Sequence, residues 1–131
     1  MIARLPKNKT IFLLGAPNDK AACEQIKIAV HHPNVINLAG ELNLLQSAAL
    51  IQNATMNYVN DSAPLHLASA MNAPVTAVFC STVPKFGFTP LSSVRRVVET
   101  KQKLDCRPCG LHGFKACPKG HFKCSELVLK E

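Results

Sequence analysis

Short apolar runs alternate with longer amphipathic segments over the first eighty residues of this chain. The apolar runs lie at residues 10–14, 35–38, 56–59 and 74–80. Between them, apolar side chains recur every three or four residues, which is the period of an α-helix with one buried face. These helical segments lie at residues 19–32, 43–54 and 62–71, with Asn43 placed to cap the second. The pattern predicts strands and helices in alternation.

The run at residues 74–80 is too apolar for either of its faces to contact water. Strands of this kind, separated by helices, are typical of an α/β fold with a mainly parallel sheet that helices cover. In such sheets, ligands bind at the carboxyl ends of the strands. Three loops fall at these ends, at residues 15–19, 39–42 and 60–63. We therefore expect the binding residues in these loops.

The loop at residues 60–63 leads into a helix whose N-terminus favours an anionic ligand. Asp61 or Ser62 is a suitable N-cap, and Pro64 suits the first helical turn. The first N–H groups of a helix carry a partial positive charge, so phosphate or pyrophosphate is the expected ligand. His66 adds a titratable donor to the same turn. The alternative is that these side chains only cap the helix or pack against it.

The size and charge of the chain narrow the choice of partner. A length of 131 residues fits one domain and one core, and the net charge of +7 divides into +3 over residues 1–100 and +4 over residues 101–131. This balance favours anionic partners. Aromatic residues make up 5% of the chain and Trp is absent, which argues against a nucleic-acid platform built on base stacking. We expect no nucleic-acid partner.

Nothing in the sequence indicates a membrane span or a secretory signal. No apolar run approaches the roughly 20 residues that cross a bilayer, and the first nine residues lead directly into the apolar run at 10–14. The expected location is therefore the cytoplasm.

The composition changes after residue 80. Residues 81–93 are rich in Pro, Gly and Ser and are expected to form a loop, and residues 94–99 are expected to form an edge strand. We place a domain boundary after residue 100, which gives a sheet domain at residues 1–100 and a basic, cysteine-rich tail at residues 101–131.

The tail holds four cysteines in the pattern C-x2-C-x7-C-x6-C, with two histidines among them. The cysteines are Cys106, Cys109, Cys117 and Cys124. Four thiolates in a group opened by C-x2-C can bind zinc tetrahedrally. Reduced thiols and disulfides are the alternatives, and a cytosolic location disfavours disulfides. The remaining two, Cys23 and Cys80, lie in apolar segments and are expected to be core residues.

Five segments together resemble the carboxyl-terminal domain of glycosyltransferase family 9, the ADP-heptose:lipopolysaccharide heptosyltransferases. They are L-L-G-A-P-N-D at 13–19, V-I-N-L-A-G-E at 35–41, N-D-S-A-P-L-H-L-A-S-A-M at 60–71, P-V-T-A-V-F at 74–79 and F-T-P-L-S at 88–92. The likeness covers nearly the whole chain and is greatest to the heptosyltransferase II branch. It implies a Rossmann-like domain that forms the carboxyl-terminal, donor-binding half of a GT-B glycosyltransferase.

The resemblance implies roles for individual residues. It gives pyrophosphate binding to the turn Asp61-Ser62-Ala63 and to His66, a ribose contact to Asp19, and adenosine contacts to Glu41 and Leu42. Two departures from the family motif are present. Ala63 stands where Gly is usual, and its methyl group limits how closely phosphate approaches the backbone. The family's F-G-P-T is replaced by F-C-S-T at 79–82.

The implied reaction is an inverting transfer of heptose from ADP-heptose to the lipopolysaccharide inner core. The family places the acceptor and the general base in an amino-terminal domain that would precede Met1, so we expect no catalytic residue and no transfer in this chain alone. No D-x-D motif occurs, so we expect no metal cofactor for catalysis. Contact with the cytoplasmic face of the inner membrane is a further expectation. The sequence leaves open the acceptor sugar and whether the donor carries heptose or another sugar.

A function of a different class also fits these residues. The chain would then be a stand-alone module that binds a nucleotide or another anion without catalysis, with a basic tail stabilised by zinc.

Overall fold

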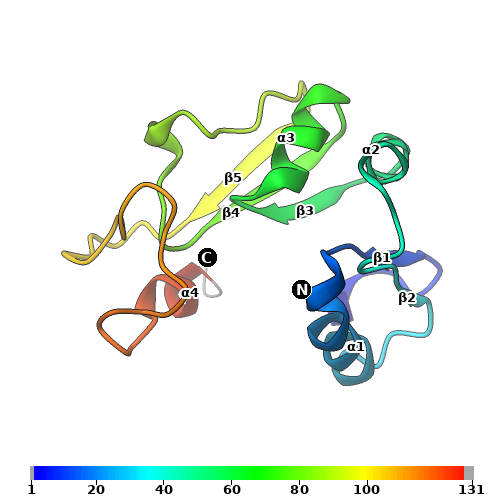
Figure 1. Cartoon of the computed structure of the whole chain (residues 1–131), viewed down its shortest axis with the longest axis horizontal. Helices are drawn as coiled ribbons and strands as arrows, with labels where there is room; N and C mark the ends of the chain where they lie inside the picture. The colour runs from blue at the N-terminus through cyan, green and yellow to red at the C-terminus, as the bar shows by residue number, and fades with distance from the viewer. Residues whose placement is uncertain (1, 129–131) are drawn as a thin grey trace. The chain divides into compact units, whose positions relative to one another are not determined.

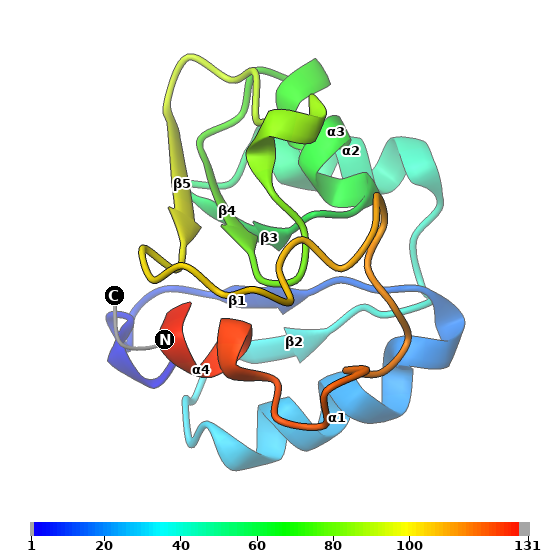
Figure 2. The same ribbon diagram turned by 90° about the vertical axis from the view of Figure 1, so that its left-hand side faces the viewer.

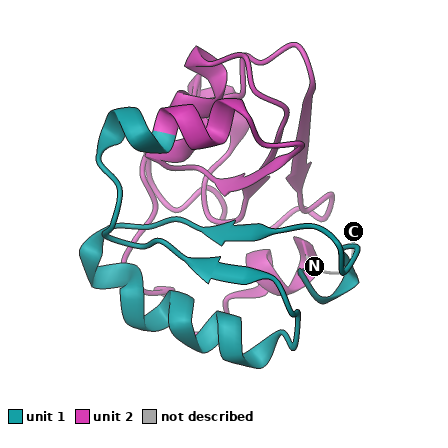
Figure 3. Ribbon diagram, turned by 90° about the vertical axis from the view of Figure 1, so that its right-hand side faces the viewer, with its two compact units in different colours: residues 1–47 teal, residues 48–131 magenta. Residues whose placement is uncertain are grey.

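The computed structural model describes residues 2–128, and these fold into elements that alternate between strand and helix (Figure 1). The chain divides into two compact units, residues 1–47 and residues 48–131 (Figure 3). The division falls within helix α2 (Leu44–Gln52).

Unit 1 contains one parallel pair of strands and a helix that packs on it. Strand β1 (Ile11–Leu13) pairs with β2 (Val35–Asn37). Between them lie a short 3-10 helix, η2 (Pro17–Asp19), and α1 (Lys20–Ala29), which contacts β2. The predicted helix at 19–32 is too long at its end. Helix α1 stops at Ala29 because the backbone turns at His31, which has a φ of +47°.

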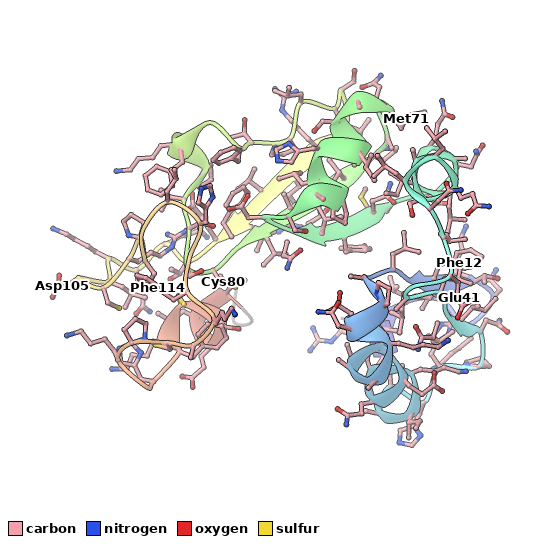
Figure 4. The ribbon with its side chains drawn as sticks, viewed as in Figure 1. Phe12, Glu41, Met71, Cys80, Asp105 and Phe114 are labelled. Carbon is pink, nitrogen blue, oxygen red and sulfur yellow. The ribbon has the colours of Figure 1, made fainter. Side chains whose placement is uncertain are left out.

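One face of the unit 1 sheet remains accessible. Phe12 and Ile36 are register partners, and their side chains are 41% and 42% exposed. Figure 4 labels Phe12 on this sheet. The strands are parallel and flanked by α1 as expected, and these two side chains remain accessible.

Unit 2 contains a three-stranded parallel sheet in the order β3-β4-β5. Its strands are β3 (Asn57–Asn60), β4 (Val75–Phe79) and β5 (Arg95–Glu99), and Figure 2 shows them side by side. Helix α3 (Ala63–Ala70) connects β3 to β4 and packs on both. The predicted edge strand at 94–99 is confirmed, since β5 pairs only with β4 among the described strands.

Strand β4 supplies the core of unit 2 on one face. Val75, Ala77 and Phe79 are fully buried, whereas the alternate residues Thr76 and Val78 are partly exposed. The prediction that neither face of this strand contacts water was therefore wrong for one face. All ladders in residues 2–128 are parallel, as predicted, but they form two sheets, one in each unit.

The tail is attached to the end of the unit 2 sheet through Arg107. Its guanidinium donates to the carbonyl oxygens of Cys80 (2.7 Å) and Thr82 (2.8 Å) and to Glu99 Oε2 (2.6 Å). Beyond it, the tail is irregular up to a short helix, α4 (Lys123–Val128), which the sequence pattern did not predict. The domain boundary after residue 100 stays a prediction.

The remaining described elements are two short 3-10 helices, η1 (Ile2–Arg4) and η3 (Pro84–Phe86). No helix within residues 2–128 is long and apolar enough to span a membrane.

Candidate functional site: the N-terminus of α3 and the loops at the strand ends

Helix α3 begins without a side-chain cap. Strand β3 ends at Asn60 and α3 starts at Ala63, so Ser62 occupies the N-cap position with an extended backbone (φ −156°, ψ 176°). The Ser62 hydroxyl donates to Asn60 Oδ1 at 2.5 Å and makes no cap hydrogen bond to the helix. Asp61 lies one residue before the cap. The predicted position of the cap is confirmed, but the predicted capping contact is not formed.

The first N–H groups of α3 are therefore available to a ligand. Helix geometry leaves the first N–H groups without intrahelical acceptors, and no side chain replaces those acceptors here. Pro64, in the first turn, contributes no N–H, and Leu65 N already donates to Ser62 O at 2.9 Å. The groups that remain are the N–H groups of Ser62 and Ala63, and Ala63 is an exposed residue. This end of the helix can donate hydrogen bonds to an anion and favours negative charge.

Phe88 forms two ring contacts near this helix end. The ring of the exposed His66 of α3 and that of Phe88 pack edge to face, with centroids 5.9 Å apart and planes at 77°. Phe88 also contacts His112 of the tail, with centroids 6.1 Å apart. The sequence indicates a role for His66 but does not indicate its contact with Phe88. No sequence pattern shows that residues so far apart along the chain meet.

In unit 1, the loops after β1 and β2 lie side by side. Gly40 N donates to Gly15 O at 2.9 Å, which joins the two loops at the carboxyl ends of the paired strands. Asp19 closes the first loop, because its Oδ2 accepts a hydrogen bond from Ala16 N at 2.8 Å. The structure therefore brings the loop of Asp19 next to the loop of Glu41, as the parallel pairing predicts.

Glu41 is held by an ion pair with the first residue of α1. Lys20 Nζ lies 2.5 Å from Glu41 Oε1, and both side chains are more than half exposed. The hydrogen bond and charge of Lys20 lower the pKa of Glu41, and Glu41 raises the pKa of Lys20 in the same way. Leu42, which follows, is partly buried. Of the predicted nucleotide-binding residues, Asp19, Glu41 and Leu42 thus belong to unit 1, and the other four belong to unit 2.

The four tail cysteines line one pocket of about 600 Å³ in unit 2. The aromatic side chains of Phe114 and Phe122 line it too, and Figure 4 labels Phe114 and Asp105 on this part of the tail. All six cysteines of the chain are free thiols. Cys23 is buried, as predicted, whereas Cys80 is only partly buried.

The thiols of this pocket differ in their surroundings. Burial, and then the nearby Cys106, Cys124 and Cys117, raise the pKa of Cys109. Backbone N–H groups, first that of Phe122, lower the pKa of Cys117. Within residues 2–128, no three His, Cys, Asp or Glu side chains are gathered closely enough to hold a metal ion as they are placed.

The chain is similar to known proteins in sequence and in fold. The model of glycosyltransferase family 9 (heptosyltransferase) matches residues 2–112. Lipooligosaccharide heptosyltransferase 2 of Haemophilus influenzae is 33% identical over 91 residues, and lipopolysaccharide heptosyltransferase 2 of Escherichia coli K12 is 34% identical over 91 residues. Each alignment covers 67% of this chain and 26% of the relative. The chain thus spans about a quarter of the length of these relatives.

Two solved structures share the fold. The structure of E. coli ADP-heptose lps heptosyltransferase II superimposes with a TM-score of 0.66 and 28% identity, over 92% of this chain and 37% of that one. A glycosyl transferase family 9 protein from Veillonella parvula gives a TM-score of 0.67 over 99% of this chain and 39% of that one, and its 19% identity supports the fold alone. The expected α/β architecture of parallel strands flanked by helices is confirmed. This chain belongs to glycosyltransferase family 9, the heptosyltransferase family.

Proposed function

We propose that this chain is the donor-binding part of a heptosyltransferase that moves heptose from ADP-heptose to the lipopolysaccharide inner core, and that it transfers no sugar by itself. The observation that carries this proposal is the uncapped N-terminus of α3, with His66 beside it. Family membership supplies the reaction class.

The chemistry of the α3 N-terminus suits a leaving diphosphate. In the transfer, the bond between the anomeric carbon and the diphosphate oxygen breaks, and negative charge develops on ADP. Donors that are already oriented toward this charge stabilise the transition state. We assign this role to the N–H groups of Ser62 and Ala63 and to the imidazole of His66, which Phe88 supports from the side. The helix dipole adds a favourable potential.

In unit 1, we propose that Asp19 binds a ribose hydroxyl of the nucleotide and that Glu41 and Leu42 line the adenosine. Asp19 uses one carboxylate oxygen to accept from Ala16 N, and its other oxygen can accept from a hydroxyl. The ion pair with Lys20 fixes the orientation of the Glu41 carboxylate through Oε1. The second oxygen, Oε2, stays available to a ligand. These assignments rest on the family motif and on local geometry.

We assign the general base and the acceptor surface to parts of the enzyme that these residues do not include. The chain corresponds to about a quarter of the length of its curated relatives, and the resemblance to the family places the base and the acceptor in an amino-terminal domain. Contact with the acceptor and with the inner membrane, and a cytoplasmic location, stay predictions.

A matched pair of histidine variants tests the proposal. Wild-type chain and its His66→Asn and His31→Asn variants are titrated with ADP and with adenosine by calorimetry. We expect weak ADP binding, because an incomplete site leaves part of the nucleotide in water. His66→Asn should weaken ADP binding roughly tenfold, the loss expected for one hydrogen bond to a charged group, and leave adenosine binding unchanged. His31 is an exposed histidine of unit 1, and its variant should behave as wild type.

Two results would contradict the proposal. Equal ADP affinity in the wild type and the His66 variant would place the phosphates elsewhere. Release of ADP from ADP-heptose in the presence of a lipopolysaccharide acceptor, in a coupled assay with the chain alone, would show that the catalytic base lies within it.

A further inference from the structure

We propose that Cys106, Cys109, Cys117 and Cys124 bind one zinc ion and that this ion fixes the fold of the tail. This site is separate from donor binding, because it involves none of the residues assigned above to the nucleotide. It would be a structural site, since four thiolates fill the tetrahedral coordination of zinc and leave no open position for catalysis.

The first argument is that the fold already gathers the four cysteines around one pocket. Two of them lie in the loop at residues 106–109, the third lies in the following loop, and the fourth lies on α4. Three separate segments thus line the same pocket, and all four sulfurs are free thiols. Thiolate is a preferred ligand of zinc, and a divalent cation offsets the repulsion between neighbouring thiolates.

The second argument comes from the backbone around the cysteines. Gly110 directly follows Cys109 and has a φ of +69°, and Gly120 follows Cys117 by three residues and has a φ of +70°. Positive φ values reverse the chain sharply and favour glycine. Gly120 N closes its turn by donating to Cys117 O at 3.0 Å. Each of these two loops is therefore folded tightly beside a cysteine.

The third argument is that the tail lacks a core of its own. Among residues 101–128, only Cys124 and Val128 are buried, and the apolar side chains of Leu111, Phe114 and Phe122 are each more than half exposed. A segment this short does not bury enough apolar surface to fix its own fold, and small folds of this kind commonly rely on metals or disulfides. A bound ion would supply the missing constraint.

Binding requires the sulfurs to move closer together. As placed, no three of the metal-binding side chains in the described part of the chain converge on one point, and the Cys109 thiol donates to Cys106 O at 3.0 Å. Rotation about χ1 moves a cysteine sulfur without moving its backbone. Loss of the thiol proton on binding would also release the Cys109 sulfur from this contact.

Metal analysis of the whole chain tests the site. Protein produced with zinc in the medium and purified under reducing conditions should contain about one equivalent of zinc. Cys109→Ser and Cys117→Ser should each lose most of it, and Cys23→Ala, which changes a buried cysteine of unit 1, should retain it. Cobalt substitution should give thiolate charge-transfer bands and the intense visible bands of a tetrahedral site.

Limited proteolysis tests whether zinc fixes the fold of the tail. Tryptic cleavage after Lys115 and Lys119 should be slow with zinc and faster after chelation, while cleavage within the unit 2 sheet stays unchanged. Zinc absent from freshly reduced protein, zinc retained in both serine variants, or disulfides joining these cysteines would overturn the proposal. So would iron with acid-labile sulfide in place of zinc, or cleavage of the tail that does not respond to the metal. None of these results depends on nucleotide binding, so the site can fail while the proposed function stands.

Discussion

Helices α2 and α3 begin in opposite ways. At α2, Gln46 N donates to Asn43 Oδ1 and Asn43 N donates to Gln46 Oε1, both at 2.9 Å, so side chains satisfy the backbone at the start of the helix. At α3, the Ser62 hydroxyl turns to Asn60 and caps nothing. The N-terminus of α2 thus carries a reciprocal side-chain cap and that of α3 carries none, and α3 follows a strand end, where α/β folds bind ligands. Under the proposed function, the first helix start serves stability and the second serves binding.

Placing a charged cap on α3 should have the largest effect. In Ser62→Asp, the carboxylate would occupy the N–H groups and repel phosphate, so ADP affinity should fall by roughly tenfold or more, about 1.4 kcal/mol. The measurement is calorimetric titration with ADP. Ser62→Asn is the control, because it can cap the helix without adding charge and should weaken binding less. ADP affinity unchanged in Ser62→Asp would mean that the ligand does not bind at this helix.

Alanine substitutions at the N-cap positions of α2 and α3 should lower stability by different amounts. Asn43→Ala breaks a reciprocal cap and should lower the free energy of unfolding by about 1 kcal/mol. Ser62→Ala removes a hydroxyl that does not cap and should cost less than about 0.5 kcal/mol. Urea unfolding at one pH measures both. Equal losses would show that Ser62 caps α3 in solution and that its N–H groups are not open.

A charge substitution near the N-terminus of α1 should have the smallest effect on stability. Lys20 places positive charge where the helix dipole disfavours it, and Glu41 compensates. The pKa of Glu41 is lowered in the folded chain. Its contribution to the free energy of unfolding is therefore present above the unfolded pKa and is lost as the pH falls through the folded pKa. The pKa of Lys20 is raised in the folded chain. Its contribution to the free energy of unfolding is therefore fully present below the unfolded pKa and is lost as the pH rises through the folded pKa.

Glu41→Gln should therefore lower the melting temperature slightly at neutral pH and low salt. The difference should vanish in acid, and it should shrink in high salt because both side chains are exposed. Thermal unfolding under these conditions measures it. A difference that persists in acid would assign the effect to packing of the side chain and not to its charge.

The sequence predicted those parts of the fold that local pattern determines. The alternation of strands and helices, the cap at Asn43 and the start of α3 all follow from spacing and from residue type within a few positions. Helix α1 was predicted too long because helical periodicity continued past Ala29, whereas the left-handed backbone at His31 ended the helix. Helix α4 was missed because its six residues are too few to show a helical period.

The parts of the site that sequence could not predict depend on contacts between distant segments. Residue type favours Ser62 as a cap, but the nearby Asn60 competes successfully for its hydroxyl. Phe88 meets His66 and His112 only because the loop after β4 and the tail both return to α3. Spacing within the tail indicated a group of cysteines, and it could not show that three separate segments bring them to one pocket.

Arg107 limits where this chain can change in length. Its side chain is only 10% exposed and holds three acceptors at once, two of them on the backbone after β4. A guanidinium makes such a fork with fixed geometry, which lysine cannot reproduce. An insertion or deletion between residues 106 and 109 would shift one cysteine relative to this fixed point. The length of the C-x2-C loop is therefore set by the sheet of unit 2 as well as by the thiols on either side of it.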